Sequence, residues 1–124
     1  MTGGASGIGA EIVKAFSGQG AKVGFLDLDQ TRSAELAEML GPDVAFEICD
    51  LRDITALKLA LDALTDRIGS ADVVVNNAGI VDSGPITEFS EAAWDRIFAV
   101  NTKGIFLMSK AAIPHLLVAD NASI

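Results

Sequence analysis

The strongest chemical signal in this sequence is a cluster of glycines directly before a helical pattern. Residues 2–9 contain four glycines. The apolar residues that follow recur with the spacing of one helix face: Ile8, Ile12, Val13 and Phe16. Backbone N–H groups at a helix start lack internal partners, and the helix dipole is positive there. Because glycine has no Cβ, this backbone can approach a phosphate, although a plain tight turn is the alternative.

Polar residues stand at the ends of three apolar runs that we predict to be strands. The runs are Lys22–Asp27, Val44–Cys49 and Asp72–Asn76. Asp27 ends the first, Asp50 follows the second, and residues 76–79 (N-N-A-G) close the third. Apolar strands that alternate with amphipathic helices predict a parallel sheet covered on both faces. In such sheets ligands bind at the carboxyl ends of the strands, so we expect these polar groups to meet the glycine turn.

Asp27 lies 18 residues after Gly9, a spacing that suits a carboxylate accepting from the two ribose hydroxyls of an adenosine. The same carboxylate would repel a 2′-phosphate. Its neighbour Leu28 carries no positive charge, and the glycine turn contains no Lys or Arg. These residues predict NAD as the cofactor, with NADP less favoured. The alternative role for Asp27 is to cap the next helix.

Two further strand ends suggest contacts to the same ligand. Asp50 could accept from the exocyclic amine of adenine while Leu51 packs on the ring, although Asp50 could also be a helix N-cap. Asn77 can bond backbone groups beside the glycine turn. Ala78 and Gly79 leave room for the central ribose and the nicotinamide. An asparagine-rich turn without a ligand is the alternative for these residues.

The pattern T-G-x-x-x-G-I-G, the N-N-A-G segment and Val100–Gly104 together resemble the short-chain dehydrogenase/reductase family. The resemblance covers essentially all 124 residues and implies a Rossmann-like dinucleotide site. The cofactor-binding residues it implies are Gly3, Ser6, Gly7, Ile8, Gly9, Asp27, Leu28, Asp50, Leu51, Asn77, Ala78 and Gly79. It also implies that Asn101 is a catalytic-site residue that orders a water-linked proton relay to a catalytic lysine.

The spacing around Asn101 gives a separate argument. A stripe of Trp94, Ile97, Asn101, Ile105 and Met108 predicts that the amide points inward. A buried amide must be hydrogen-bonded or it costs about 1–3 kcal/mol. A structural amide that ties the helix to the sheet is therefore the alternative to a catalytic role.

Composition excludes several classes of function. Half of the residues are apolar and the net charge is −8, with Lys and Arg scattered, which argues against disorder and against nucleic-acid binding. No apolar run reaches the ~18 residues of a membrane span. One His and one Cys make no zinc site, and the lone Cys49 with no export signal favours a cytoplasmic protein.

The expected fold is α/β: one partial NAD-binding domain over residues 1–124, with a three-layer, doubly wound parallel sheet truncated at both ends. The expected helices beyond the first are 31–40, one from Asp53 to Ile68, and 90–113, which Pro114 should end; 122–124 should begin another strand. The resemblance places one further strand before the glycine turn, between the strands ending at Asp27 and Asn76. It also implies a Ser, Tyr and Lys segment after residue 124, and the chain contains no tyrosine.

The resemblance implies an NAD-dependent oxidoreductase that moves hydride between nicotinamide and a small alcohol or carbonyl substrate, present here as a fragment. A chain without tyrosine should be inactive alone. The alternative is a non-catalytic NAD-binding module or inactive paralogue that pairs with a partner chain. A methyltransferase-like domain would share the glycine turn but does not account for N-N-A-G. The long helix, by resemblance, predicts a homo-oligomer, either a dimer or a tetramer.

Overall fold

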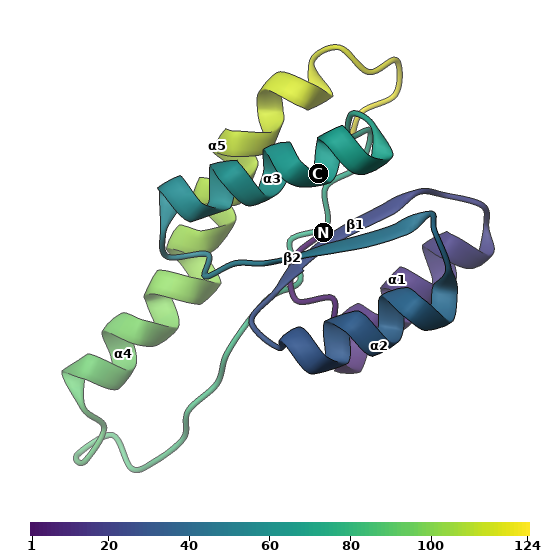
Figure 1. The fold of residues 1–124 in the computed structure, drawn as a ribbon. Helices are drawn as coiled ribbons and strands as arrows, with labels where there is room; N and C mark the ends of the chain where they lie inside the picture. The colour runs from purple at the N-terminus through teal and green to yellow at the C-terminus, as the bar shows by residue number, and fades with distance from the viewer.

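The structure is a computed structural model that describes residues 1–124, and Figure 1 shows its elements. In chain order they are α1 (Gly7–Gly18), β1 (Val23–Asp27), α2 (Gln30–Leu40), β2 (Val44–Ile48), α3 (Ile54–Ile68), α4 (Glu91–Phe98), the π-helical turn η1 (Ala99–Gly104) and α5 (Ile105–Leu116). Helices α1 and α2 lie on one side of the strands, and α3 and α5 lie on the other (Figure 1). The expected three-layer α/β architecture is confirmed.

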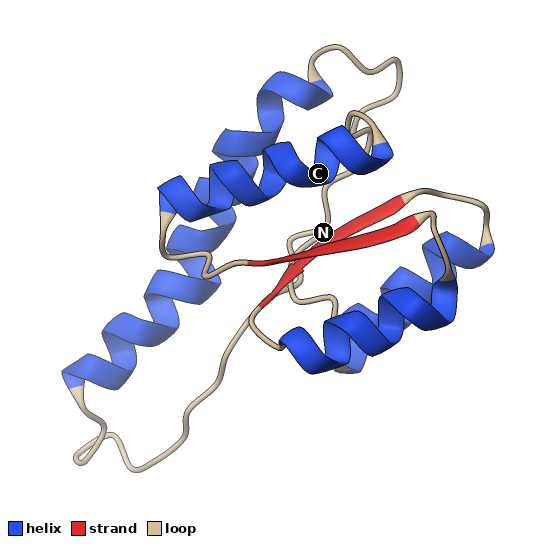
Figure 2. Ribbon diagram, viewed as in Figure 1, coloured by secondary structure: helices blue, strands red, loops and turns tan.

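The sheet is parallel and its strand order reverses in the middle. β1 pairs with β2 in register from Val23↔Val44 to Asp27↔Ile48, and these are the two strands drawn red in Figure 2. Isolated parallel bridges extend the sheet: Thr2 pairs with both Leu26 and Asn76, and Val73 pairs with Ser123. The order across the sheet is therefore β2, β1, Thr2, residues 73–76 and Ser123. The predicted strand 72–76 is in place but pairs only through these bridges.

Side-chain caps fix where three helices begin. Asp29 accepts from the backbone N–H of Arg32 at α2, and Asp53 accepts from Thr55 N and Ala56 N at α3. Ser90 accepts from Ala93 N at α4. Each cap satisfies N–H groups that have no partner inside the helix. The N-caps of α2 and α3 are thus Asp29 and Asp53. Asp27 and Asp50, for which the sequence allowed a capping role, do not cap these helices.

The predicted end of the last helix at Pro114 is wrong, because α5 continues to Leu116. Proline removes its own N–H bond and its ring crowds the carbonyl four residues earlier, but its fixed φ is compatible with a helix. One final turn therefore closes after it, with Leu117 N donating to Ile113 O at 3.0 Å.

The core divides between the two faces of the sheet. A cluster of 13 buried residues joins α3 and α5 to one face, and a cluster of seven joins α1 and α2 to the other. The predicted buried face of α1 is wrong in part: Val13 is fully buried, but Ile8 is 76 % exposed and Phe16 is 40 % exposed. The helix packs instead through Gly9, Ala10 and Val13, since small residues bring its first turn close to the sheet. None of the helices combines the length and apolarity that a membrane span requires.

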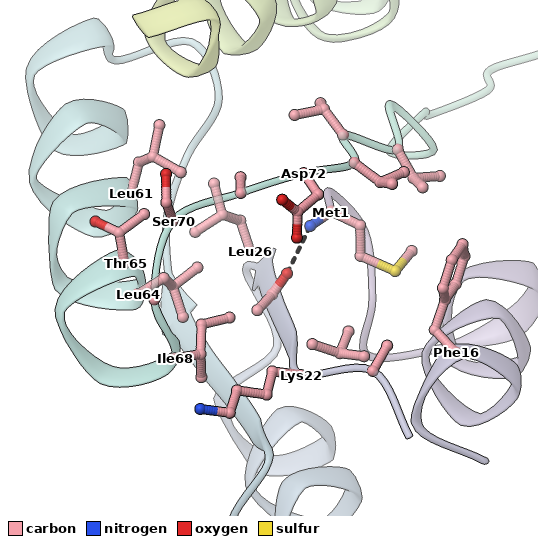
Figure 3. A pocket seen from close by; sticks show the side chains of 18 of the residues that line it. Met1, Phe16, Lys22, Leu26, Leu61, Leu64, Thr65, Ile68, Ser70 and Asp72 are labelled. Atoms are coloured by element: carbon pink, nitrogen blue, oxygen red, sulfur yellow. Dashed lines mark hydrogen bonds between the residues drawn. The ribbon is translucent and has the colours of Figure 1, made fainter. Parts of the chain in front are cut away.

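A cavity of about 350 Å³ separates β1 from residues 72–75, and Figure 3 shows the side chains around it. Met1 lies in this cavity, and its amine donates to Gly24 O at 2.5 Å. The cavity lies between the two strands where the sequence predicts a further strand, and Thr2 bridges the same two strands at its end.

Candidate functional site

A second cavity, of about 380 Å³, opens at the carboxyl edge of the sheet. All of the predicted cofactor-binding residues except Gly7 line it. They come from the loop before α1, from the ends of β1 and β2, and from the segment after residue 76. The strand-end argument thus brings together residues that are more than 70 positions apart in the chain. Leu26, Cys49, Ile80 and Val100 complete the lining and were missed, since an apolar residue carries no chemical signal that separates a site from the core.

The glycine loop has a geometry that only glycine allows at several positions. Gly3 and Gly7 have positive φ angles of 68° and 54°. A Cβ on Gly9 would lie 1.7 Å from Gly3 O, so the loop and the first turn of α1 are in backbone contact. A Cβ on Gly7, in contrast, would meet no atom within 4 Å. The loop is therefore closed toward the sheet and open above Gly7.

The N-terminus of α1 faces this cavity without a side-chain cap. Ser6 occupies the N-cap position, but its side chain makes no cap hydrogen bond, and the first turn contains no acidic residue. Its N–H groups are therefore available to an anion, as the helix dipole favours. The exposed Ile8 also lines the cavity, so its position fits a ligand contact better than the core contact that its spacing suggested.

Asp27 both lines the cavity and holds the glycine loop. Its Oδ2 accepts from Ala5 N at 2.9 Å, and its Oδ1 accepts from Leu28 N at 2.7 Å and from Asp29 N at 3.0 Å. A carboxylate has about four acceptor sites, so one remains free on Oδ2. No Lys or Arg lines the cavity. The bond to Ala5 was not foreseen, because nothing in the spacing marks it.

Asp50 lies at the end of β2 in a tight ion pair with Arg52. The guanidinium Nε and Nη2 and the backbone N of Arg52 all donate to its carboxylate. The hydrogen bonds from the Arg52 side chain lower the pKa of Asp50. Beside it, the thiol of Cys49 is buried, and burial followed by the charges of Asp50 and Asp53 raises its pKa to about 11. The thiol at this wall of the cavity is therefore neutral near pH 7.

Asn77 joins the glycine loop to the strand end. Its Nδ2 donates to Thr2 O at 3.2 Å and to Gly3 O at 2.9 Å. In return the Thr2 hydroxyl accepts from Asn77 N and Ala78 N, both at 3.1 Å. Thr2 is 2 % exposed, and sequence reasoning had not singled it out for this contact.

Asn101 lies in the π-helical turn and bonds to both polar groups of one residue. Its Oδ1 accepts from Ile80 N and its Nδ2 donates to Ile80 O, both at 2.9 Å. The amide thereby holds the segment after Gly79 against the long helix. The predicted inward stripe is wrong in two places, since Trp94 is 53 % exposed and Ile105 is 42 % exposed. The wide turn between them changes the phase of the helix, which a single 3.6-residue period ignores.

Comparisons with known proteins agree with this geometry. The family model described as short chain dehydrogenase matches residues 1–124. The (+)-borneol dehydrogenase 2 of Salvia officinalis is 40 % identical over 130 residues, covering 100 % of this chain and 45 % of the relative. A 3-ketoacyl-(acyl-carrier-protein) reductase from Brucella melitensis, solved with NADH, aligns with a TM-score of 0.88 at 32 % identity, over 92 % of this chain and 48 % of that one.

A blue fluorescent protein from a metagenomic library, solved with NADPH, aligns with a TM-score of 0.83 at 28 % identity, over 91 % of this chain and 48 % of that one. The chain spans about half the length of the curated relatives it matches. The family match covers the whole chain, and its members bind nicotinamide cofactors in the fold described above. This chain therefore belongs to the short-chain dehydrogenase/reductase family.

Proposed function

We propose that this chain is the NAD-binding portion of an oxidoreductase acting on a small alcohol or carbonyl substrate. The observation that carries the proposal is the single cavity lined by the glycine loop, Asp27, Asp50 and residues 77–79. When bound, the nicotinamide would supply hydride exchange at its C4 atom. The chain's own residues would hold the cofactor. In particular, the uncapped N-terminus of α1 and the open backbone at Gly7 suit the pyrophosphate.

The proposed cofactor is NAD, with NADP less favoured. The free acceptor site on Asp27 suits a ribose hydroxyl, and its charge would repel a phosphate at the 2′ position. The exposed Leu28 beside it supplies no compensating cation. Asp50 and Leu51 would contact the adenine, and Ala78 and Gly79 the central part of the cofactor.

Titration of the protein expressed from its native gene with NADH and NADPH tests this proposal. We expect NADH to bind at least tenfold more tightly, and Asp27→Ala to reduce that preference. Asp66→Asn, on the exposed face of α3, removes one charge elsewhere and should leave the preference unchanged. Equal affinity for both dinucleotides, or a preference for NADPH, would contradict the assignment.

Catalysis needs a general acid/base that these residues do not include. The resemblance assigns that role to a tyrosine beside a lysine, and the 124 residues contain no tyrosine. Within this chain we propose that Asn101 serves the catalytic site, where its amide fixes the loop that closes the nicotinamide end. If the protein binds NADH but oxidises no alcohol and reduces no carbonyl compound in a broad substrate screen, the alternative of a non-catalytic NAD-binding module replaces the oxidoreductase.

The outer face of the long helix supports a second proposal, a homo-oligomer. Exposed apolar residues recur along it with spacings of four and seven residues on either side of η1: Trp94, Phe98, Phe106, Ile113 and Leu117. The rings of Trp94 and Phe98 stack with centroids 4.4 Å apart. Sedimentation equilibrium should show a dimer or tetramer that Phe98→Glu dissociates, whereas a monomeric wild type would contradict this proposal.

A further inference from the structure

Both oxygens of the Asp50 carboxylate accept hydrogen bonds from Arg52, although the carboxylate lines the proposed cofactor cavity. Its Oδ1 accepts from the backbone N of Arg52 at 3.0 Å and from Nε at 2.9 Å. Its Oδ2 accepts from Nε at 3.0 Å and from Nη2 at 2.5 Å. These four contacts come from three N–H groups, because Nε is shared between the two oxygens, and all three belong to Arg52.

Asp27 at the neighbouring strand end differs in this respect. Its three donors are backbone N–H groups of Ala5, Leu28 and Asp29, which are fixed by the fold. Three of the four contacts to Asp50, in contrast, come from a side chain that can rotate away. The Arg52 guanidinium bonds to no other residue, and the Arg52 side chain is 49 % exposed. The Asp50 carboxylate can therefore be released by the movement of one side chain.

We propose that Arg52 determines how strongly the cavity selects a purine with an exocyclic amine, by competing with that amine for the Asp50 carboxylate. The inference rests on the proposed cofactor site. An amino group of adenine that reaches Asp50 must share the carboxylate with the Arg52 guanidinium or displace it, so adenine binding carries the cost of weakening the ion pair. A hypoxanthine base has an oxygen in place of the amine, gains nothing from Asp50 and leaves the pair intact.

The expected size of the effect follows from the exposure of the pair. Exposed ion pairs are weak, so their loss is expected to change a dissociation constant only about 1.4- to 5-fold. The effect should also shrink in high salt, because salt screens an exposed ion pair.

The test measures the binding of NADH and of reduced nicotinamide hypoxanthine dinucleotide by nucleotide fluorescence, using the protein expressed from its native gene. Arg52→Ala should tighten NADH binding by about 1.4- to 5-fold and leave the hypoxanthine analogue within error of wild type. Arg32→Ala is the matched control, because Arg32 forms a comparable exposed pair with Asp29, 3.5 Å away. It removes the same charge without touching Asp50, so any general loss of attraction for the phosphates appears there.

A third variant tests whether the effect passes through Asp50. In an Asp50→Ala background, Arg52→Ala should no longer change the affinity ratio of the two dinucleotides. Circular dichroism melts should show that each variant retains the fold. An unchanged ratio in Arg52→Ala, or a loss of NADH affinity because Arg52 holds Asp50 in place for the amine, would overturn this inference and leave the proposed function standing. If the wild type binds neither dinucleotide, the proposed function falls and this inference falls with it.

Discussion

Thr2 and Asn77 bond to each other in both directions, and this exchange joins the glycine loop to the end of the neighbouring strand. The Thr2 hydroxyl accepts from Asn77 N at 3.1 Å, and Asn77 Nδ2 donates to Thr2 O at 3.2 Å. The same hydroxyl accepts from Ala78 N, and Thr2 is 2 % exposed. One buried oxygen thus satisfies two backbone donors at the base of the proposed site.

Thr2→Val keeps the shape of the side chain but removes this acceptor. Two partly buried N–H groups then lose their partner, and we expect the free energy of unfolding to fall by about 1–3 kcal/mol. Urea denaturation measures the change. Thr2→Ser retains the hydroxyl and should lose less than the valine variant. A valine variant as stable as wild type would show that the two N–H groups find other partners.

Gly9→Ala should damage the site most among single glycine changes. The added Cβ would lie 1.7 Å from Gly3 O and 2.7 Å from Asn77 Nδ2, so the loop must move away from α1. We expect NADH affinity to fall by more than tenfold, measured by fluorescence titration. Gly18→Ala is the matched control at the other end of the same helix, where a Cβ meets no atom within 4 Å. It should bind NADH normally, and a comparable loss in both variants would contradict the steric argument.

Asn101→Asp separates the two bonds of the Asn101 amide. Aspartate still accepts from Ile80 N but cannot donate to Ile80 O, and the two oxygens repel each other. Amide hydrogen exchange at residues 79–82 should be faster in this variant, and faster still in Asn101→Ala, while exchange in β1 and β2 stays unchanged. Exchange at residues 79–82 that matches wild type would show that the amide does not hold this segment.

Cys49 makes the stability of the fold depend on pH in the alkaline range. Burial, followed by the charges of Asp50 and Asp53, raises the pKa of the thiol from 9.0 to about 11. The unfolded chain therefore loses this proton first, and between about pH 9 and 11 the folded state binds more protons. The free energy of unfolding falls with pH across that window, by up to about 2–3 kcal/mol. Urea melts at several pH values should show the fall in wild type and a smaller one in Cys49→Ala.

The sequence was most informative about the edge of the sheet. Parallel strands leave their carboxyl ends on one side, so Asp27, Asp50 and residues 77–79 could be placed together without any knowledge of packing. The start of α3 at Asp53 was equally local, because a cap involves only the first turn of its helix. What these residues bind stays a prediction.

Features that depend on three-dimensional contacts could not be predicted from the sequence. The ion pair between Arg52 and Asp50 depends on a rotamer, and the hydroxyl of Thr2 accepts from residues 75 and 76 positions away. Ile8 and Phe16 fitted the helix period but not the buried face, since the close approach of Gly9 to Gly3 sets how α1 lies on the sheet. Periodicity shows which residues share one face of a helix, but it does not show whether that face points toward the sheet.

The wide turn η1 holds about one more residue than regular α-helical winding would place between α4 and α5. Removing one residue from Ala99–Gly104 would therefore let this stretch wind as an α-helix while α4 and α5 keep their mutual rotation. The aromatic pair of Trp94 and Phe98 would stay on the apolar outer face, whereas the bulge that carries Asn101 to Ile80 would be lost. A one-residue gap in this stretch of an alignment therefore marks a relative with the same outer surface and a differently held loop after Gly79.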